Sequence, residues 1–406
     1  MKKLLVVAVA LGILVPLAFG DEPKFSGELR IFSAAYLDDR TGAEDLFGEI
    51  RFLPAVAWQT DYDWFLYIQG DFRLDSENYA SGVFDGVEDD GRWIGNLRQA
   101  YAEYTEDLFK LRVGKQIFDW STTDTISPSD NINPRDWVDV AEWERIGVPA
   151  IDLRYGDATF WEFVYIPWST PSKLPAGRWE YDLPPGLVSG GIDGPENDYD
   201  QFALRAGTNV SGWDLGASYY HGYSYNPSVS FQPPNAINTE YIREDVVAVS
   251  AVGEIGGGVM LRAEAGYFNQ HGNNDFVQFV IGADRFWNDV FRTTDELYLL
   301  VQYTDEVETK NDNPAAFRIY DFRRAFRRSF MARAQYSFDD TRQWTLKLEG
   351  SYNCEDDDSY IQPSVAFRRN NLEIEAGIGF ASGPKNTFWG EWRENDRIFI
   401  QCTYHF

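Results

Sequence analysis

Apolar and polar residues alternate with a period of two along most of the chain. In segment 64–74, one set of alternate positions is apolar throughout, whereas the other set includes Gln69, Asp71 and Arg73. Successive side chains of a β-strand point to opposite faces, so this pattern predicts strands with one apolar and one polar face. A soluble sandwich would bury the apolar faces, whereas a membrane barrel turns them toward lipid and keeps water in its lumen.

About 18 such segments follow one another, each ~9–14 residues long, which is the length that a tilted strand needs to cross a bilayer. The sequence therefore predicts an all-β protein, a transmembrane antiparallel up-and-down β-barrel of about 18 strands, with about 16 as the alternative. The predicted strands lie near 25–38, 46–60, 63–75, 93–105, 108–118, 148–156, 158–167, 199–210, 212–222, 243–254, 257–269, 274–285, 295–304, 327–338, 342–353, 358–369, 371–382 and 396–406.

The connections between these strands alternate in length, which is typical of an outer-membrane barrel with short periplasmic turns and long external loops. The short turns all fall at one end if residue 25 starts on the periplasmic side. They lie near 60–63, 105–107, 156–157, 211–212, 255–258, 339–342 and 369–371. The long loops lie near 76–92, 119–147, 168–198, 223–241, 305–325 and 383–395. Segment 286–294 is long and aromatic for a periplasmic turn.

Both ends of the chain fit an exported barrel. Two lysines, an apolar run over 4–17 and small residues at 18–20 predict a secretory signal peptide at 1–20, followed by a single barrel over 21–406. The last strand ends in Phe406 and resembles the terminal signal that the barrel-assembly machinery recognises; an ordinary edge strand is the alternative. We therefore expect the outer membrane of a Gram-negative bacterium, with lipopolysaccharide and membrane lipid as neighbours.

Composition excludes several other functions. The net charge of −28 argues against nucleic-acid binding, which depends on basic residues. The histidines His221 and His271 lie near Ser224 and Asp275 but outside any nucleophile motif, and Cys354 and Cys402 are expected too far apart to bridge. Neither a phosphate-binding loop nor a Cys/His metal spacing occurs. We expect no enzyme activity, no cofactor and no metal.

The polar faces predict a charged lumen in which basic residues slightly outnumber acidic ones. Arginine ladders could draw anions through water, or Arg–Glu pairs on neighbouring strands could brace the wall, and bracing is favoured for any single residue. Tryptophans in the loops, such as Trp137, Trp143 and Trp389, could stack on sugar rings, but loop packing is favoured. Acidic loop clusters such as 355–358 could hold Ca²⁺ but fit better a solvated face, which divalent ions could join to lipopolysaccharide.

Segment 111–120, Leu-Arg-Val-Gly-Lys-Gln-Ile-Phe-Asp-Trp, and segment 130–137, Asp-Asn-Ile-Asn-Pro-Arg-Asp-Trp, resemble a stretch of porin-like outer-membrane barrels related to the alginate-export channels. The resemblance covers about 50 residues and implies a passive pore of about 18 strands, in some members for anionic polysaccharides. It places Arg112, Lys115, Gln116, Asn133, Arg135 and Asp136 at or near the constriction. The chain departs from the pattern at Ser121, and Lys115 breaks the alternation, which predicts a β-bulge there.

These observations predict a passive pore or export channel for hydrophilic, saccharide-like solutes with an anionic bias, narrowed by loop 119–147 or 168–198. The alternative is a structural or surface-binding barrel whose loops plug its lumen. The expected pore-lining and constriction residues are Arg30, Arg51, Arg73, Arg98, Lys110, Arg112, Lys115, Gln116, Asn133, Arg135, Asp136, Arg154, Arg205, Arg262 and Arg333.

Overall fold

The computed structural model describes residues 22–40, 44–60, 63–76, 95–181, 188–193, 201–314, 321–338 and 341–406, with the backbone alone for 188–193. The predicted signal peptide and most of the predicted loop 76–92 lie outside these residues. Within them, no helix has the length and apolar character needed to cross a membrane.

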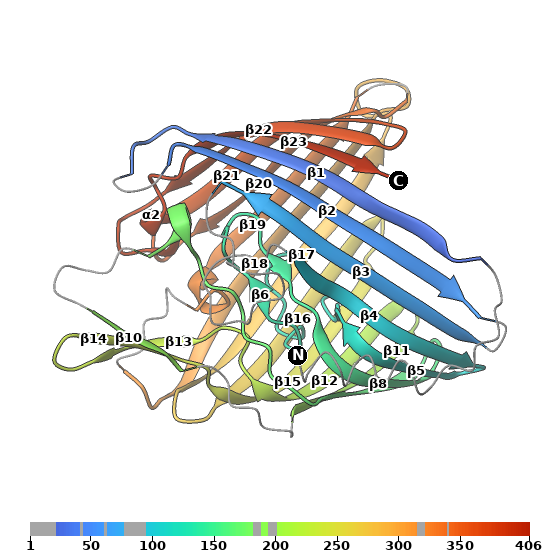
Figure 1. The fold of residues 1–406 in the computed structure, drawn as a ribbon, viewed down its shortest axis with the longest axis horizontal. Coiled ribbons are helices and arrows are strands. Elements are labelled where there is room, and N and C mark those ends of the chain that lie inside the picture. Colours follow the sequence, from blue (N-terminus) through green and yellow to red (C-terminus); the bar gives the residue numbers. More distant parts are fainter. Residues whose placement is uncertain are drawn as a thin grey trace.

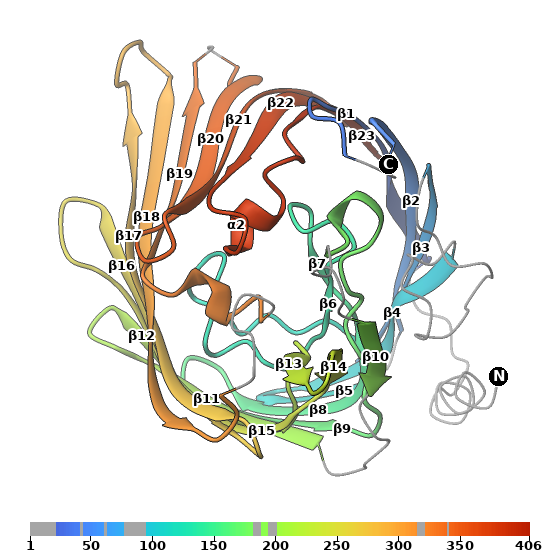
Figure 2. The same cartoon turned by 90° about the vertical axis from the view of Figure 1, so that its left-hand side faces the viewer.

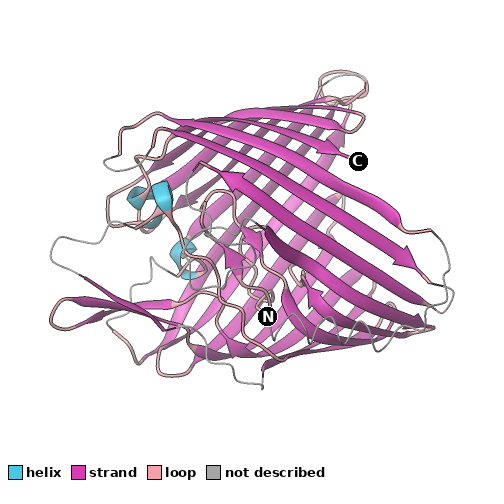
Figure 3. Ribbon diagram, in the orientation of Figure 1, coloured by secondary structure: helices cyan, strands magenta, loops and turns pink. Residues whose placement is uncertain are grey.

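The described chain forms a closed antiparallel barrel of 18 strands (Figures 1 and 3). Each strand pairs with the next along the chain, and β1 pairs with β23 to close the ring. The barrel strands are β1 (Lys24–Tyr36), β2 (Leu46–Gln59), β3 (Trp64–Asp75), β4 (Gly95–Glu106), β5 (Phe109–Gln116), β8 (Val148–Gly156), β9 (Phe160–Ile166), β11 (Gln201–Val210), β12 (Trp213–Tyr223), β15 (Arg243–Glu254), β16 (Val259–Gln270), β17 (Asn274–Asn288), β18 (Glu296–Asn311), β19 (Ser329–Ser337), β20 (Trp344–Asn353), β21 (Asp358–Arg369), β22 (Leu372–Ser382) and β23 (Arg397–His405).

The predicted fold class and strand number are confirmed, with two local corrections. Strand β18 continues to Asn311, paired with β17, so the first part of the loop predicted at 305–325 is strand. Its alternation of apolar residues fades there because both faces of a strand can be polar beyond the lipid. The bulge predicted at Lys115 is wrong, since β5 keeps a regular register with both neighbours through Lys115. The register shift lies instead in β4, where Arg98 is the extra residue between the partners of Gln69 and Gly70.

The outer face of the barrel is apolar. Large hydrophobic side chains at alternate strand positions are exposed around the ring, among them Ile50, Ile68, Val247, Val249, Ile281, Val301, Leu346 and Ile400. The residues between them point inward and are largely polar or charged, such as Arg51, Asp71 and Glu264. A soluble protein would bury its apolar strand faces, so this inverted arrangement is that of a barrel in lipid.

Several connecting segments fold back into the barrel, as the view along its axis shows (Figure 2). One of them is segment 117–147, called the inner loop below, which carries the short strands β6 (Arg135–Asp136) and β7 (Glu144–Arg145). The others contain the 3-10 turns η1 (Gly177–Trp179) and η3 (Arg324–Phe326) and the helix α2 (Phe388–Glu391). Segments predicted as loops also form a small sheet of β10 (Val188–Asp193), β13 (Ser228–Gln232) and β14 (Ala236–Glu240).

The seam between β1 and β23 depends on close approach at Gly27. The backbones of Gly27 and Phe406 exchange hydrogen bonds of 3.0 and 3.1 Å. A Cβ atom on Gly27 would lie 2.5 Å from the Phe406 ring and 2.8 Å from the carbonyl oxygen of Leu53, so the seam would have to shift. The ring of Phe406 also stacks on Phe52, with centroids 5.8 Å apart.

Gly27→Ala is therefore expected to destabilise the barrel by about 1–3 kcal/mol, the usual cost of overpacking. The measurement is the urea concentration at which the refolded protein loses its heat-resistant, fast-migrating band in electrophoresis. Gly48→Ala is the matched control, because a Cβ at Gly48 meets no atom within 4 Å. Equal urea midpoints for the two variants would contradict the packing argument.

Candidate pore constriction

The inner loop is fixed to the far wall through one carboxylate, Glu264 on β16. Its Oε1 atom accepts hydrogen bonds from the backbone N–H and hydroxyl of Thr122, the latter at 2.7 Å, and from the N–H of Thr123 at 2.8 Å. Its Oε2 atom accepts from the hydroxyl of Ser127 at 2.7 Å and from the N–H and hydroxyl of Ser129 at 3.1 and 2.6 Å. One buried side chain therefore holds the whole turn 122–129 against β16.

The opposite side of the inner loop is fixed to β1–β4 by a cluster of ion pairs. Glu144 lies 2.5 Å from Arg98 and within 4 Å of Arg30 and Arg73, and it receives two hydrogen bonds from Arg51, one of them 2.8 Å long. These four arginines come from four neighbouring strands. The arginine ladder of this wall thus meets the inner loop rather than open lumen.

The remaining charges of this wall are also paired. Arg51 forms a bidentate pair with Asp71, with both contacts at 2.8 Å, and Arg30 contacts Glu49 at 3.1 Å. Arg73 lies 3.0 Å from Asp71 and 3.1 Å from Asp136 of the inner loop. Such pairs support the bracing interpretation of the lumen charges. We call Arg30, Arg51, Arg73, Arg98 and Glu144 the latch cluster.

Glu144 remains ionised in this setting. Burial alone would raise the pKa of its carboxyl group, but the surrounding guanidinium groups, that of Arg51 first, hold this pKa well below its usual range. The latch cluster therefore keeps its attraction throughout the ordinary pH range.

Three of the residues assigned by resemblance support the inner loop from within. The amide of Asn133 accepts from the N–H of Phe118 at 2.7 Å and donates to the carbonyl of Ile146 at 2.8 Å. The fully buried Gln116 at the end of β5 donates to the carbonyl of Ala150 on β8 at 3.0 Å, and its own carbonyl accepts a hydrogen bond of 3.3 Å from the amide of Asn133 in the inner loop. Arg135 is buried beside Asp130, 2.9 Å away. These contacts shape the loop that narrows the lumen, whereas Asp136 connects it to the wall.

The structure does not bring the other expected residues to one place. They divide among separate wall contacts: Lys110 and Arg112 with Glu103, Lys115 with Asn96, Arg154 with Glu162, Arg205 against the rings of Trp120 and Phe160, Arg262 with Asp284, and Arg333 with Asp124 and Glu349.

An aromatic cluster links the inner loop to the other inward segments. Trp137 stacks on Phe322 with centroids 4.1 Å apart, and Trp179, Phe388 and Trp392 pack around the same centre. Trp392 is fully buried. The packing interpretation of the loop tryptophans is confirmed for Trp137, Trp179, Trp389 and Trp392, whereas Trp143 keeps part of its surface exposed.

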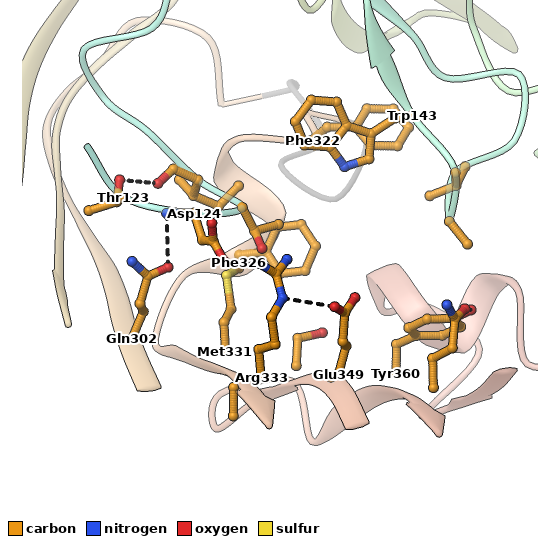
Figure 4. Close-up of a pocket in the computed structure, with 18 of the residues that line it drawn as sticks. Thr123, Asp124, Trp143, Gln302, Phe322, Phe326, Met331, Arg333, Glu349 and Tyr360 are labelled. Carbon is orange, nitrogen blue, oxygen red and sulfur yellow. Dashed lines mark hydrogen bonds and ion pairs between the residues drawn. The ribbon is translucent and has the colours of Figure 1, made fainter. Parts of the chain in front are cut away.

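A cavity of about 400 Å³ lies between the inner loop and the wall formed by β18–β21 (Figure 4). Arg333 from β19 contacts Asp124 of the inner loop at 2.9 Å and Glu349 of β20 at 2.8 Å. Trp143 and Phe322 lie across the cavity from this charged group (Figure 4). Sequence reasoning selected Arg333 but missed Asp124, Glu144, Glu264 and Glu349 as site residues, although Glu264 and Glu349 could be placed on inward faces by alternation alone.

The histidines occupy a different environment from the one expected. His221 Nδ1 and His271 Nε2 lie 2.7 and 2.9 Å from opposite oxygens of Asp245. Ser224 instead accepts a hydrogen bond of 2.7 Å from Arg323. Within the described residues, no group of three or more His, Cys, Asp or Glu side chains is arranged to hold a metal ion.

No protein-family model matches the sequence, and no curated protein matches it. Among solved structures, a triple and a double mutant of the Rhodopseudomonas blastica porin each match with 11% identity and a TM-score of 0.45, covering 95% of this chain and 100% of theirs. A chain from work on the asymmetric conductivity of engineered proteins matches with 11% identity, the same coverage and a TM-score of 0.46. These similarities are weak, and the relation to alginate-export channels stays a prediction.

The location of the chain follows from its own surface. An 18-stranded closed barrel leaves no strand edge unpaired, and its exposed outer side chains are apolar whereas its inner ones are charged. The chain is therefore an 18-stranded outer-membrane β-barrel of a Gram-negative bacterium.

Proposed function

We propose that this barrel is a passive pore for hydrophilic solutes, and that solutes pass between the inner loop and β18–β21. The cavity at that place carries the proposal, because it is the open space beside a loop whose other sides are fixed to the wall by Glu264 and by the latch cluster. A pore that narrows at a loop held inside the barrel selects solutes by size and by the charges beside the opening.

The charges beside the proposed passage are mixed in sign. Asp124, Arg333 and Glu349 form one contact group, with about a third of each side chain exposed. Most of the arginines from which an anion preference was expected lie beside carboxylates, whereas Arg205 lies against aromatic rings, which leaves the anion bias little support. Saccharide-like solutes, which carry many hydroxyl groups and little charge, fit this passage better than strongly anionic ones.

The test is single-channel conductance of the refolded mature protein in a planar bilayer under a salt gradient. Arg333→Glu is expected to shift the reversal potential toward cation preference by a severalfold change in permeability ratio, because it reverses a charge at the passage. Arg112→Glu makes the same change of charge beside Glu103, away from the cavity, and serves as the control. Equal shifts in the two variants would place the passage elsewhere, and a silent but folded barrel would refute the pore.

One observation favours a second candidate, a structural or surface-binding barrel with a closed lumen. The aromatic cluster around Trp137, Phe322 and Trp392 is buried between the inward segments, with no more than 7% of any of these three residues exposed. This candidate predicts no steady conductance, together with binding to cells or glycans that depends on the external loops. The two functions therefore give opposite results in the same bilayer experiment.

A further inference from the structure

The cavity has two chemically different walls. The aromatic residues, together called the aromatic wall below, form two groups: Trp137, Trp143 and Phe322 in one, and Tyr360 and Trp389, on the side of Glu349, in the other. The other wall is polar and carries Asp124, Arg333 and Glu349. Its volume of about 400 Å³ lies within the range of ~300–1,000 Å³ that is typical of small-molecule sites. An apolar surface facing a few fixed polar groups is the usual composition of such sites.

The aromatic wall is preformed. Trp137 and Phe322 stack with centroids 4.1 Å apart, and Tyr360 and Trp389 stack at 4.6 Å with nearly parallel rings. The hydroxyl of Tyr360 is held by Gln362 at 2.6 Å, and the indole N–H of Trp389 donates to Ser351 at 2.9 Å. Trp137, Phe322 and Trp389 are at most 7% exposed and hold the wall in place, whereas Trp143 and Tyr360 keep ring surface open to a ligand. Rings held in this way lose little conformational freedom when a ligand binds, and their negative faces attract weakly positive C–H groups.

The polar wall determines which ligands fit. Arg333 contacts both Asp124 and Glu349, so an ionic ligand would have to displace one of these partners. A neutral polyol does not need to displace either partner. A guanidinium group has five N–H donors and a carboxylate has about four lone-pair sites, so Arg333, Asp124 and Glu349 can hydrogen-bond to hydroxyl groups while they stay paired. Hydrogen bonds to charged groups are also stronger than those between neutral groups.

We propose that this cavity is a binding site for a neutral sugar, of the size of a mono- or disaccharide, with its C–H face against the aromatic wall and its hydroxyls on Asp124, Arg333 and Glu349. The site lies on the proposed passage and rests on the proposed pore for its access from both sides. The sugar class deepens that function, because it assigns the solute by the chemistry of both walls.

The experiment uses the refolded full mature chain and three neutral disaccharides, cellobiose, maltose and sucrose, with digalacturonate as the anionic comparison. Binding is measured twice, as saturable block of the ionic current and as saturable quenching of tryptophan fluorescence in detergent. At least one neutral disaccharide is expected to bind, and to bind more tightly than digalacturonate.

Trp143→Ala is expected to weaken that binding about five- to tenfold, the usual effect of losing one aromatic contact. Trp344→Ala is the matched control, because Trp344 is exposed at the other end of β20 and packs at a tilt against Phe367. Glu349→Gln keeps the shape of the wall and is expected to weaken the neutral sugar severalfold while improving the binding of digalacturonate. If Trp143→Ala fails to fold, the Glu349→Gln variant still tests the site.

The failures are distinguishable. If the barrel is silent in the bilayer but a neutral sugar quenches its fluorescence saturably and Trp143→Ala weakens this quenching, the pore is refuted and the site stands. If the barrel conducts but none of the three neutral sugars binds, or if Trp143→Ala and Trp344→Ala bind alike, the site is refuted and the pore stands. Tighter binding of digalacturonate would make the cavity an anion site and overturn the proposal.

Discussion

Glu264→Ala should release the turn 122–129 from the far wall and raise the single-channel conductance. The carboxylate of Glu264 accepts six hydrogen bonds from that turn. Hydrogen bonds to a charged group contribute about 1.5–3 kcal/mol each and are not additive, so the loss of docking free energy is on the order of 5 kcal/mol. We expect a larger, noisier conductance, because a loosened loop no longer occupies one position in the lumen.

Glu264→Gln should have an intermediate effect, because one amide oxygen can still accept hydrogen bonds while its NH₂ group faces donors. The position of the loop is checked independently by limited proteolysis within 117–147. Glu375→Ala provides the control, since Glu375 on β22 is also a carboxylate of the inner wall but accepts its hydrogen bonds from Lys347 of β20 and Ser364 of β21, which are wall residues. If Glu264→Ala and the parent protein agreed in both conductance and proteolysis, Glu264 would have no role in holding the loop.

The barrel could be predicted from sequence because the pattern that specifies it, the alternation of apolar and polar residues, is visible within each strand. Alternation within each strand decides which side chains face lipid, and segments such as 64–74 display it without reference to the rest of the chain. The rule fails where lipid no longer imposes it, as at the outer end of β18. It also cannot detect a bulge whose extra residue is itself polar, which is why Arg98 was overlooked in favour of Lys115.

The inward course of the loops could not be predicted, because it depends on contacts between residues far apart in sequence. Alternation placed Arg30, Arg51 and Arg73 on one face, but nothing in the sequence marks Glu144 as their partner. Trp137 and Phe322, which stack on each other, likewise lie in two loops that are far apart in sequence. The resemblance at 111–137 pointed to a segment that folds into the barrel, but Gln116 hydrogen-bonds to a neighbouring strand and Asn133 to the backbone of the segment itself, which the sequence did not indicate.

Arg51→Ala should weaken the attachment of the inner loop to β1–β4 by about 3–5 kcal/mol, because it leaves buried carboxylates without their main partner. The guanidinium of Arg51 is almost completely buried and bridges Asp71 to Glu144. We expect greater proteolytic access to 117–147 and an altered conductance. Arg342→Ala is the control, since Arg342 pairs with Glu296 in an exposed setting where one ion pair contributes little.

The partner variant Glu144→Gln separates the ion pair from mere packing. If Arg51 acts through Glu144, the double variant should lose less than the sum of the single losses, with a coupling of about 0.5–3 kcal/mol.

Because the pKa of Glu144 is lowered, its contribution is present above the usual carboxyl pKa of about 4.3 and is lost only as the pH falls through the lower folded value. The contribution of Glu144 should therefore stay constant from about pH 5 to 8 and be lost only in stronger acid. Additive losses in the double variant would show that the latch cluster does not hold the loop by charge.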